Sequence, residues 1–287
     1  MLNLKSVPDP VAVWQVVGER AAASRFEALH SEPTKLIGRE EEFALLRRRW
    51  DHVKTEEGRL ALIYGEPGIG KSRLVFALQE SIREDPHHCL QFQCAPHRIQ
   101  TAFYPVINLF EHTTGFSVGD SDGIKLDKLG TLLASSSHNL TRDVALFAEL
   151  LSIPAPAGMS DLSISPQRRK ELILELLVGQ IAALASQKPV LIVLEDAHWI
   201  DPTTHELFDI LVERIRALPV LLVITYRPEF TPPWLGQSHV TVLTLNRLGR
   251  RENGALVRRI AGEKDLHRSC SSRSSGAPTE SLCSSRR

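Results

Sequence analysis

The chain has 287 residues, of which 43% are hydrophobic and 24% are charged, the proportions of an ordinary globular protein. Its 34 acidic and 34 basic residues cancel, which excludes a global field that would draw the protein toward nucleic acid or an anionic membrane. The four cysteines form no C-x-x-C pair, and the first residues lack the layout of a signal peptide. We therefore expect a cytoplasmic protein with reduced thiols that neither crosses a membrane nor binds nucleic acid directly.

The chain begins with a segment that holds too few apolar side chains to form a core, so we interpret residues 1–34 as a linker or the end of an upstream domain. After it, short and uniformly apolar runs alternate with segments that carry apolar residues at helical spacing. Such runs are typical of parallel strands buried on both faces. Strands are predicted at 60–64, 88–93, 190–194, 220–225 and 240–245, and helices at 41–53, 71–84, 104–112, 126–133, 141–151, 165–187 and 201–215.

Two of these helices carry a clear start signal. Ser165 and Asp201 are each followed by proline, so each offers a side-chain cap to a helix whose first position needs no N–H group. The alternation of helices and strands predicts an α/β fold with a mainly parallel five-stranded sheet flanked by helices. This domain is expected to span residues 35–247, with a loop at 153–160.

Residues 248–287 depart from that pattern. Eight serines lie within 269–285, and nine basic residues face four acidic ones within 250–287. A segment with so few apolar residues cannot offset its ordering entropy by burial, so disorder is expected beyond residue 263.

The sequence Gly65-Glu66-Pro67-Gly68-Ile69-Gly70-Lys71-Ser72 matches the phosphate-binding pattern G-x-x-x-x-G-K-[ST] at every fixed position. Its glycines let the backbone curl so that N–H groups point at phosphate oxygens, and the helix that follows adds partial positive charge. Lys71 is expected to reach the β- and γ-phosphates of ATP, and the Ser72 hydroxyl to bind Mg²⁺. The loop lies between a buried strand and an amphipathic helix, which is the context that the pattern requires.

Two adjacent carboxylates, Glu195 and Asp196, follow the apolar strand 190–194. In P-loop NTPases such a strand is expected beside the strand that leads into the phosphate loop, where one acid faces the magnesium and a second orients or deprotonates water. By position, Glu195 takes the metal-side role and Asp196 the water-side role. Most such motifs place Asp first, so the division of roles stays open, as does the alternative that both are ordinary loop carboxylates.

Further candidates lie near a strand end and near the start of the domain. Arg227 follows the strand 220–225, where it could reach a γ-phosphate; the alternative is a solvated or salt-bridged loop arginine. Arg39 could lie near the base and ribose, or could be a surface charge at a helix entry. His198 and Trp199 follow the two acids, and a core or interface role is favoured for them over a catalytic histidine.

Four motifs occur in the order Ile37-Gly38-Arg39-Glu40, Gly65–Ser72, Leu194-Glu195-Asp196-Ala197-His198-Trp199-Ile200-Asp201 and Ile224-Thr225-Tyr226-Arg227-Pro228. Together they resemble the AAA/STAND-type ATPase module of large bacterial signalling proteins, which include LuxR-type regulators, some kinases and proteins of the soluble adenylyl cyclase type. The resemblance runs from about residue 34 to residue 259. It implies an ATP-dependent switch in signal transduction, with Mg²⁺ as cofactor and slow hydrolysis.

The start of the chain resembles a second family. Pro10-Val11-Ala12-Val13-Trp14 and Ser24-Arg25-Phe26 are similar to the end of a class III nucleotide cyclase domain, where it joins the ATPase module in cyclase–ATPase–TPR proteins. This resemblance implies fused cyclase and TPR-type partners in the intact protein. The cyclase catalytic residues would lie upstream, so we expect no cyclic AMP synthesis from this chain alone.

The family pattern continues after residue 259 into a helical lid, a winged-helix-like domain and repeats, whereas this sequence becomes rich in serine and arginine. We hypothesise that the reading frame shifts near Lys264 and leaves a truncated lid. Three alternatives to the switch remain open: an ATPase of ordinary turnover, the ATPase module of a LuxR-type transcriptional regulator, and a non-functional gene fragment.

Overall fold

The structure is a computed structural model that describes residues 36–55, 57–117, 119–134, 137, 139–154 and 164–261. The predictions for residues 1–34, for most of the loop 153–160 and for the tail beyond 263 lie outside the described residues. The described elements are α2 (Glu40–Val53), β1 (Arg59–Tyr64), α3 (Lys71–Ser81), β2 (His88–Gln93), α4 (Tyr104–Thr113), α5 (Asp122–Leu133), α6 (Leu140–Leu150), α7 (Pro166–Ala185), β3 (Val190–Glu195), α8 (Pro202–Arg214), β4 (Val220–Tyr226), β5 (Val240–Thr244) and α9 (Arg250–Ala261), with short 3₁₀ turns η1 (Pro96–Arg98), η2 (Ala197–Trp199) and η3 (Ile215–Ala217).

The predicted strands are all present, with bounds that differ by one residue at most, whereas helices α3, α5 and α7 differ by two to four residues at one end. Helix α3 ends at Ser81, and Asp85 in the turn beyond it accepts a hydrogen bond from Trp50 Nε1 (2.9 Å), which ties this turn to α2. Helix α5 begins earlier than predicted, because the Ser121 hydroxyl accepts a hydrogen bond from the Ile124 amide (3.4 Å) and caps it.

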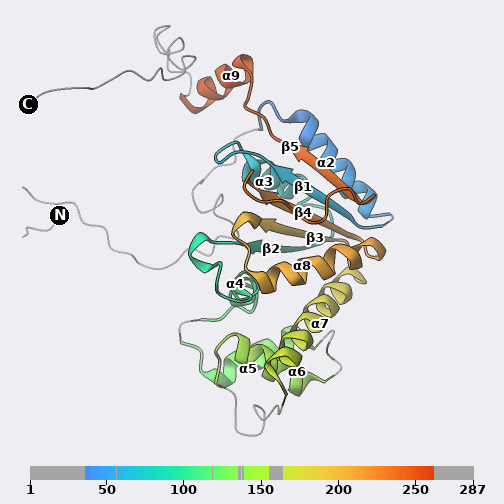
Figure 1. Cartoon of the computed structure of the whole chain (residues 1–287), viewed down its shortest axis with the longest axis vertical. Helices are drawn as coiled ribbons and strands as arrows, with labels where there is room; N and C mark the ends of the chain where they lie inside the picture. The colour runs from blue at the N-terminus through green and yellow to red at the C-terminus, as the bar shows by residue number, and fades with distance from the viewer. Residues whose placement is uncertain are drawn as a thin grey trace, which may run out of the picture.

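The five strands form one parallel sheet in the order β2-β3-β4-β1-β5 (Figure 1). The prediction that the acid-bearing strand β3 lies beside the phosphate-loop strand β1 is therefore wrong, because β4 lies between them. β1 pairs with β4 over its full length, up to Tyr64 opposite Tyr226. As a result, the residues that follow β4 stand between the phosphate loop and the two acids.

The central strands send alternate side chains into two separate cores, because successive side chains of a strand point to opposite faces. On one face Ile63 packs with Trp50 of α2 and with α3. On the other face Leu62 packs in a larger core with Phe208 of α8 and with α4 and α7. The result is a sheet covered by helices on both faces, as Figure 1 shows, which explains why the strands read as continuous apolar runs.

Helices α5 and α6 extend the larger core away from the sheet, toward the lower end of the view in Figure 1. They belong to the segment between β2 and β3, and they contact each other closely. Phe147 of α6 stacks on Phe110 of α4, with ring centres 4.7 Å apart. This contact joins the helical extension to the layer that covers the sheet.

The predicted caps of α7 and α8 are confirmed. Ser165 Oγ accepts a hydrogen bond from the Arg168 amide (3.2 Å), and Asp201 Oδ1 accepts one from the Thr204 amide (2.9 Å). Each helix has proline at its first position, as predicted. Both helices flank β3 in the chain, so their fixed starts help to position the strand that carries the acids.

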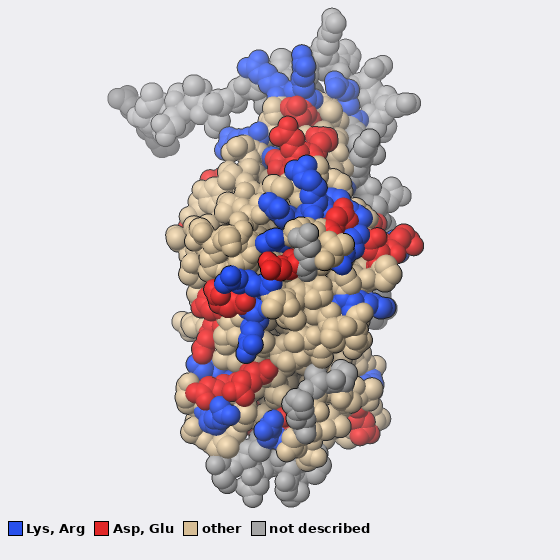
Figure 2. Space-filling model, turned by 90° about the vertical axis from the view of Figure 1, so that its right-hand side faces the viewer, with Lys and Arg blue, Asp and Glu red and all other residues tan. Residues whose placement is uncertain are grey.

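The surface carries mixed charge on the face shown in Figure 2, where Lys and Arg side chains are interspersed with Asp and Glu. This view agrees with the equal numbers of acidic and basic residues. Among the helices of the described segments, none has the length and apolar character that a membrane crossing needs.

Replacing Phe208 with alanine should lower the free energy of unfolding by about 3–5 kcal/mol, because the fully buried ring would leave a cavity against Phe92. Urea unfolding followed by circular dichroism measures the loss. Ile210→Ala on the same helix is the matched control, since Ile210 is 37% exposed and should cost far less. Equal losses at the two positions would contradict the packing described for α8.

Candidate functional site

The glycine loop leaves the carboxyl end of β1 and enters α3 at Lys71. Gly68 and Gly70 have φ angles of +72° and +105°, in the left-handed region that favours glycine. A Cβ atom built at either glycine would meet no atom within 4 Å, so there is open space beside the loop at both positions. The loop therefore has room for a ligand against its backbone, as a phosphate cradle requires.

The side chain of Lys71 folds back over this loop. The residue is 7% exposed, and its Nζ donates hydrogen bonds to the carbonyl oxygens of Gly65 (2.7 Å) and Glu66 (3.0 Å). Burial lowers the pKa of Lys71, while the carboxylate of Asp196 raises that pKa and the guanidinium of Arg227 lowers it. Lys71, Asp196 and Arg227 thus share one electrostatic neighbourhood, although they come from α3 and from the ends of two different strands.

The two acids lie at the end of β3, held by both neighbouring strands. Glu195 is 3% exposed, and its carbonyl oxygen accepts a hydrogen bond from the Cys94 amide (3.1 Å). Asp196 has a φ angle of +58°, and its amide donates to Thr225 Oγ1 (3.0 Å). Gln93 Nε2 donates to the Asp196 carboxylate (3.4 Å). These contacts fix the direction in which residues 196–201, called the acid loop below, leave the sheet.

Gln93 and Thr225 were not among the residues predicted for the site. Each is polar and lies at the carboxyl end of a strand, Gln93 on β2 and Thr225 on β4. Gln93 is the register partner of Glu195. The signal that could have found them is a polar side chain that ends a buried strand of a parallel sheet, because such ends meet at one edge.

Asp201 fixes the far end of the acid loop, a role beyond the helix cap that its sequence context predicted. Its carboxylate is 1% exposed and accepts hydrogen bonds from the amides of Phe103 (3.1 Å), Thr203 (3.1 Å) and Thr204 (2.9 Å). It also accepts one from Thr204 Oγ1 (2.6 Å). This one buried group therefore joins the acid loop, the start of α8 and the segment that enters α4.

Arg227 packs on an aromatic ring at the edge of the site. Its guanidinium carbon lies 4.6 Å from the centre of the Trp199 ring, a cation–π contact. Its Nη1 atom lies 4.0 Å from Glu229 Oε1, a long distance for an ion pair. The His198 ring lies 4.3 Å from the Trp199 ring on η2. Trp199 thus contacts both a histidine and the predicted phosphate-sensing arginine.

Arg39 is buried, which excludes the surface-charge alternative. Its guanidinium donates hydrogen bonds to the carbonyl oxygens of Ile69 (3.4 Å) and Asn246, and it pairs with Glu42 (3.0 Å). The arginine thus braces the glycine loop against the segment that follows β5. A contact with the base or ribose stays a prediction.

The candidate ligands for Mg²⁺ are the hydroxyl of Ser72, the second residue of α3, and the carboxylate of Glu195, the last residue of β3. Both offer oxygen, the ligand type that Mg²⁺ prefers, and Mg²⁺ is commonly held by one or two side chains together with substrate phosphates. These residues fit the ion. Separately, the described ranges contain no group of three or more His, Cys, Asp or Glu side chains that could hold a metal.

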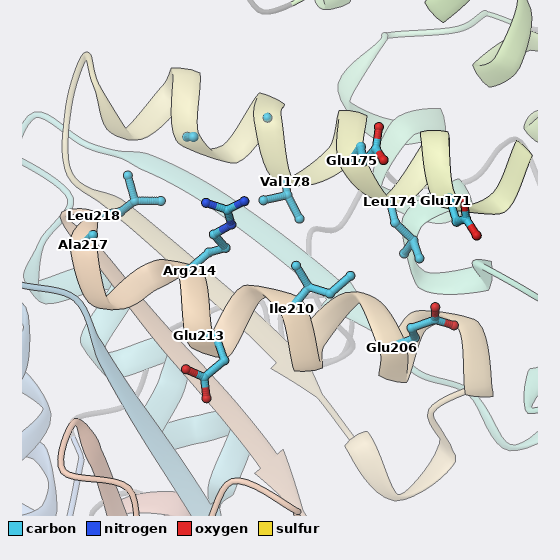
Figure 3. A pocket seen from close by; sticks show the side chains of 12 residues that line it. Glu171, Leu174, Glu175, Val178, Glu206, Ile210, Glu213, Arg214, Ala217 and Leu218 are labelled. Carbon is cyan, nitrogen blue, oxygen red and sulfur yellow. The ribbon is translucent and has the colours of Figure 1, made fainter. Parts of the chain in front are cut away.

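A cavity of about 720 Å³ lies elsewhere, between α7 and α8 (Figure 3). Glutamates from both helices line it, together with Arg214 and apolar side chains such as Val178 and Ile210. None of its lining residues comes from the glycine loop or the acid loop. This cavity is therefore separate from the site at the end of the sheet.

Comparison with known proteins gives one family match and one curated relative. A family model described as "AAA ATPase domain" matches residues 35–224. An uncharacterized protein of Rhizobium meliloti (strain 1021) is 30% identical over 292 residues, which cover 98% of this chain and 28% of that protein. This chain thus spans little more than a quarter of the length of this relative.

Similar chains also occur in solved structures. They include Cdc6p from Pyrobaculum aerophilum, with 17% identity, a TM-score of 0.46, and coverage of 81% of this chain and 52% of that one. A chain of Drosophila ORC bound to DNA has 14% identity and a TM-score of 0.46, covering 89% and 56%. A chain of the E. coli MS115-1 HORMA:CdnC:Trip13 complex has 12% identity and a TM-score of 0.41, covering 83% and 72%.

Asp201→Ala should destabilise the protein by about 2–4 kcal/mol, because it removes a helix cap and leaves buried amides without an acceptor. Thermal and urea unfolding measure the loss. Ser165→Ala, which removes the cap of α7 at an exposed position, is the matched control and should cost clearly less. If the two substitutions prove equivalent, Asp201 acts only as a cap and does not anchor the acid loop.

Proposed function

This chain belongs to the AAA ATPase domain family, and we propose that it binds ATP with Mg²⁺ as a nucleotide-dependent switch that hydrolyses ATP slowly. The observation that carries the proposal is the glycine loop, which has open space along its backbone, is covered by the Lys71 side chain, and lies at the sheet edge where the strands that lead to Asp196 and Arg227 also end. Two cations and a carboxylate at one sheet edge suit the charge of a nucleoside triphosphate and its metal ion.

In this proposal the backbone of residues 65–70 and the start of α3 bind the phosphates, and Lys71 neutralises the β- and γ-phosphates. Ser72 and Glu195 hold Mg²⁺, which when bound neutralises charge across the same phosphates. Arg39 supports the loop through the Ile69 carbonyl oxygen.

Asp196 is proposed to orient the attacking water and to accept its proton, while the water oxygen bonds to the γ-phosphorus and the bond from that phosphorus to the ADP oxygen breaks. The contacts of Asp196 with Thr225 and Gln93 support this role, because they hold the acid at a fixed place beside the sheet. Arg227 is proposed to stabilise the charge that develops on the γ-phosphate. ADP and inorganic phosphate are the products.

The switch is favoured over an ATPase of ordinary turnover because both cations already have partners in the protein. Lys71 is bonded to two carbonyl oxygens of its own loop, and Arg227 rests on Trp199. A triphosphate must exchange these contacts for contacts to phosphate, so binding rearranges the loop and η2 together. The nucleotide state is thereby coupled to the conformation of the protein.

The wider setting is also part of the proposal. The motif resemblance favours a signalling protein of the cyclase–ATPase–TPR type, in which fused cyclase and TPR-type domains respond to the nucleotide state of this domain. We place the protein in the cytoplasm, where a reduced buried thiol such as that of Cys94 is the rule. ATP is the expected small-molecule partner, and nucleic acid is not expected to bind this chain.

Lys71→Ala should weaken ATP binding by about 100-fold, because hydrogen bonds from a charged group to the β- and γ-phosphates are lost. Isothermal titration with ATP and Mg²⁺ measures this. Lys188→Ala, an exposed lysine just before β3 at the opposite end of the sheet, is the control and should bind as the wild type does. Unchanged ATP affinity in Lys71→Ala would overturn the proposed site.

Exchanging each acid for its amide should separate the two roles. Glu195→Gln should raise the Mg²⁺ concentration needed for half-maximal ATP turnover, because a metal ligand loses its charge. Asp196→Asn should lower single-turnover phosphate release about 100-fold or more at an unchanged Mg²⁺ requirement. If Asp196→Asn shifts the Mg²⁺ requirement instead, the assignment of the two acids is reversed.

A further inference from the structure

His198 has an environment unlike that of a core histidine. It lies on η2, two residues after Asp196, and both of its ring nitrogens are buried without a hydrogen-bond partner among the described residues. At His88 and His239, by contrast, only one ring nitrogen is in that condition. The second nitrogen of His239 bonds the Val212 carbonyl oxygen (3.1 Å), as expected of a structural histidine.

Charged groups on three different segments affect the pKa of the His198 imidazole. Burial lowers the pKa of His198, Asp196 and Glu229 raise it, and Arg227 and Lys71 lower it. These groups come from the ends of β3 and β4 and from the first residue of α3, and they include residues assigned above to the phosphates. The Trp199 ring, which contacts the His198 ring, also contacts Arg227. The interpretation of His198 as a core or interface residue does not account for this charged surrounding.

Leaving polar nitrogens buried and unpaired costs free energy, and buried polar groups are satisfied in the great majority of native structures. A group that is unpaired in the ligand-free protein and faces a binding site is therefore a candidate to be paired by the ligand. A neutral imidazole carries one N–H donor and one acceptor nitrogen. The donor suits a phosphate oxygen, and the acceptor suits a water molecule.

We propose that His198 is a further phosphate-contacting residue, which donates a hydrogen bond to the γ-phosphate and so distinguishes ATP from ADP. This inference rests on the proposed function. The contact is assigned to the γ-phosphate because His198 lies two residues after Asp196 and contacts the same Trp199 ring as Arg227, whereas the glycine loop supplies the contacts to the inner phosphates. His198 thus adds a donor that ADP leaves unpaired.

Trp199 is the positioning residue for this contact. Its ring touches the His198 ring, with centres 4.3 Å apart, and it also carries the Arg227 guanidinium at 4.6 Å. One indole therefore sets the places of two side chains that address the same phosphate. Trp199→Phe, which keeps an aromatic face, should retain the preference for the triphosphate, and Trp199→Ala should lose most of it.

The test compares affinities for a non-hydrolysable triphosphate, AMP-PNP, and for ADP, each with Mg²⁺, by isothermal titration of the full chain. His198→Ala should weaken AMP-PNP binding about tenfold and ADP binding less than about twofold. His198→Gln should recover part of the loss, because its amide also donates. His88→Ala is the matched control, a partly buried histidine with an unpaired ring nitrogen at the amino end of β2, and should change neither affinity.

Retained ADP affinity also shows that His198→Ala is folded. If the variants fail to fold, an NMR titration of the wild-type protein gives the test. The ¹⁵N resonances of the His198 ring should shift when AMP-PNP is added and should not shift when ADP is added. Equal losses for both nucleotides, no loss for either, or equal resonance shifts would overturn the inference alone. Absence of any Lys71-dependent nucleotide binding by the wild type would overturn the proposed function and this inference with it.

Discussion

Parallel pairing brings the carboxyl ends of the strands to a single edge of the sheet, and the site depends on this constraint. The strand interiors are apolar because helices cover both faces, so the polar residues at the carboxyl ends of the strands and just beyond them gather at that edge. They include Gln93, Glu195, Thr225 and the glycine loop that follows β1. Residues far apart in the sequence thus meet without any long polar segment crossing the core.

The position of β4 in the middle of the sheet decides how the parts of the site communicate. Thr225 holds the Asp196 amide on one side, and Tyr226 faces Tyr64, the residue before the glycine loop, on the other. Arg227 then extends the same strand toward Trp199. β4 is therefore the strand that connects the loop strand β1 to the acid-bearing strand β3, which do not pair directly.

Much of the fold could be predicted from the sequence because its signals are local. The apolar runs, the proline-linked caps at Ser165 and Asp201, and the glycine pattern each depend on residues close together in the chain. The order of the strands depends on which strands pair along the sheet. β3 and β4 are both uniformly apolar, so their sequences do not indicate which of them lies beside β1. The sequence prediction therefore had the strands right, but it was wrong in placing β3 beside β1.

The unforeseen parts of the site have the same cause. The bonds of Asp201 to Phe103 and of Gln93 to Asp196 join residues about a hundred positions apart. The burial of Arg39 and the unpaired nitrogens of His198 likewise depend on what surrounds them in three dimensions. The residue type shows that a side chain can form hydrogen bonds, but its partners are known only from the folded structure.

The contacts of Arg39 connect the glycine loop to two other segments of the domain. The Arg39 guanidinium, just before α2, donates hydrogen bonds to the carbonyl oxygens of Ile69 and Asn246. Asn246 lies between β5 and α9. Arg39 thus connects the start of α2 and the segment between β5 and α9 to the same turn of the glycine loop. A shift of that turn would therefore move the start of α2 and the segment before α9 together, so that two parts of the domain far apart in the sequence respond as one.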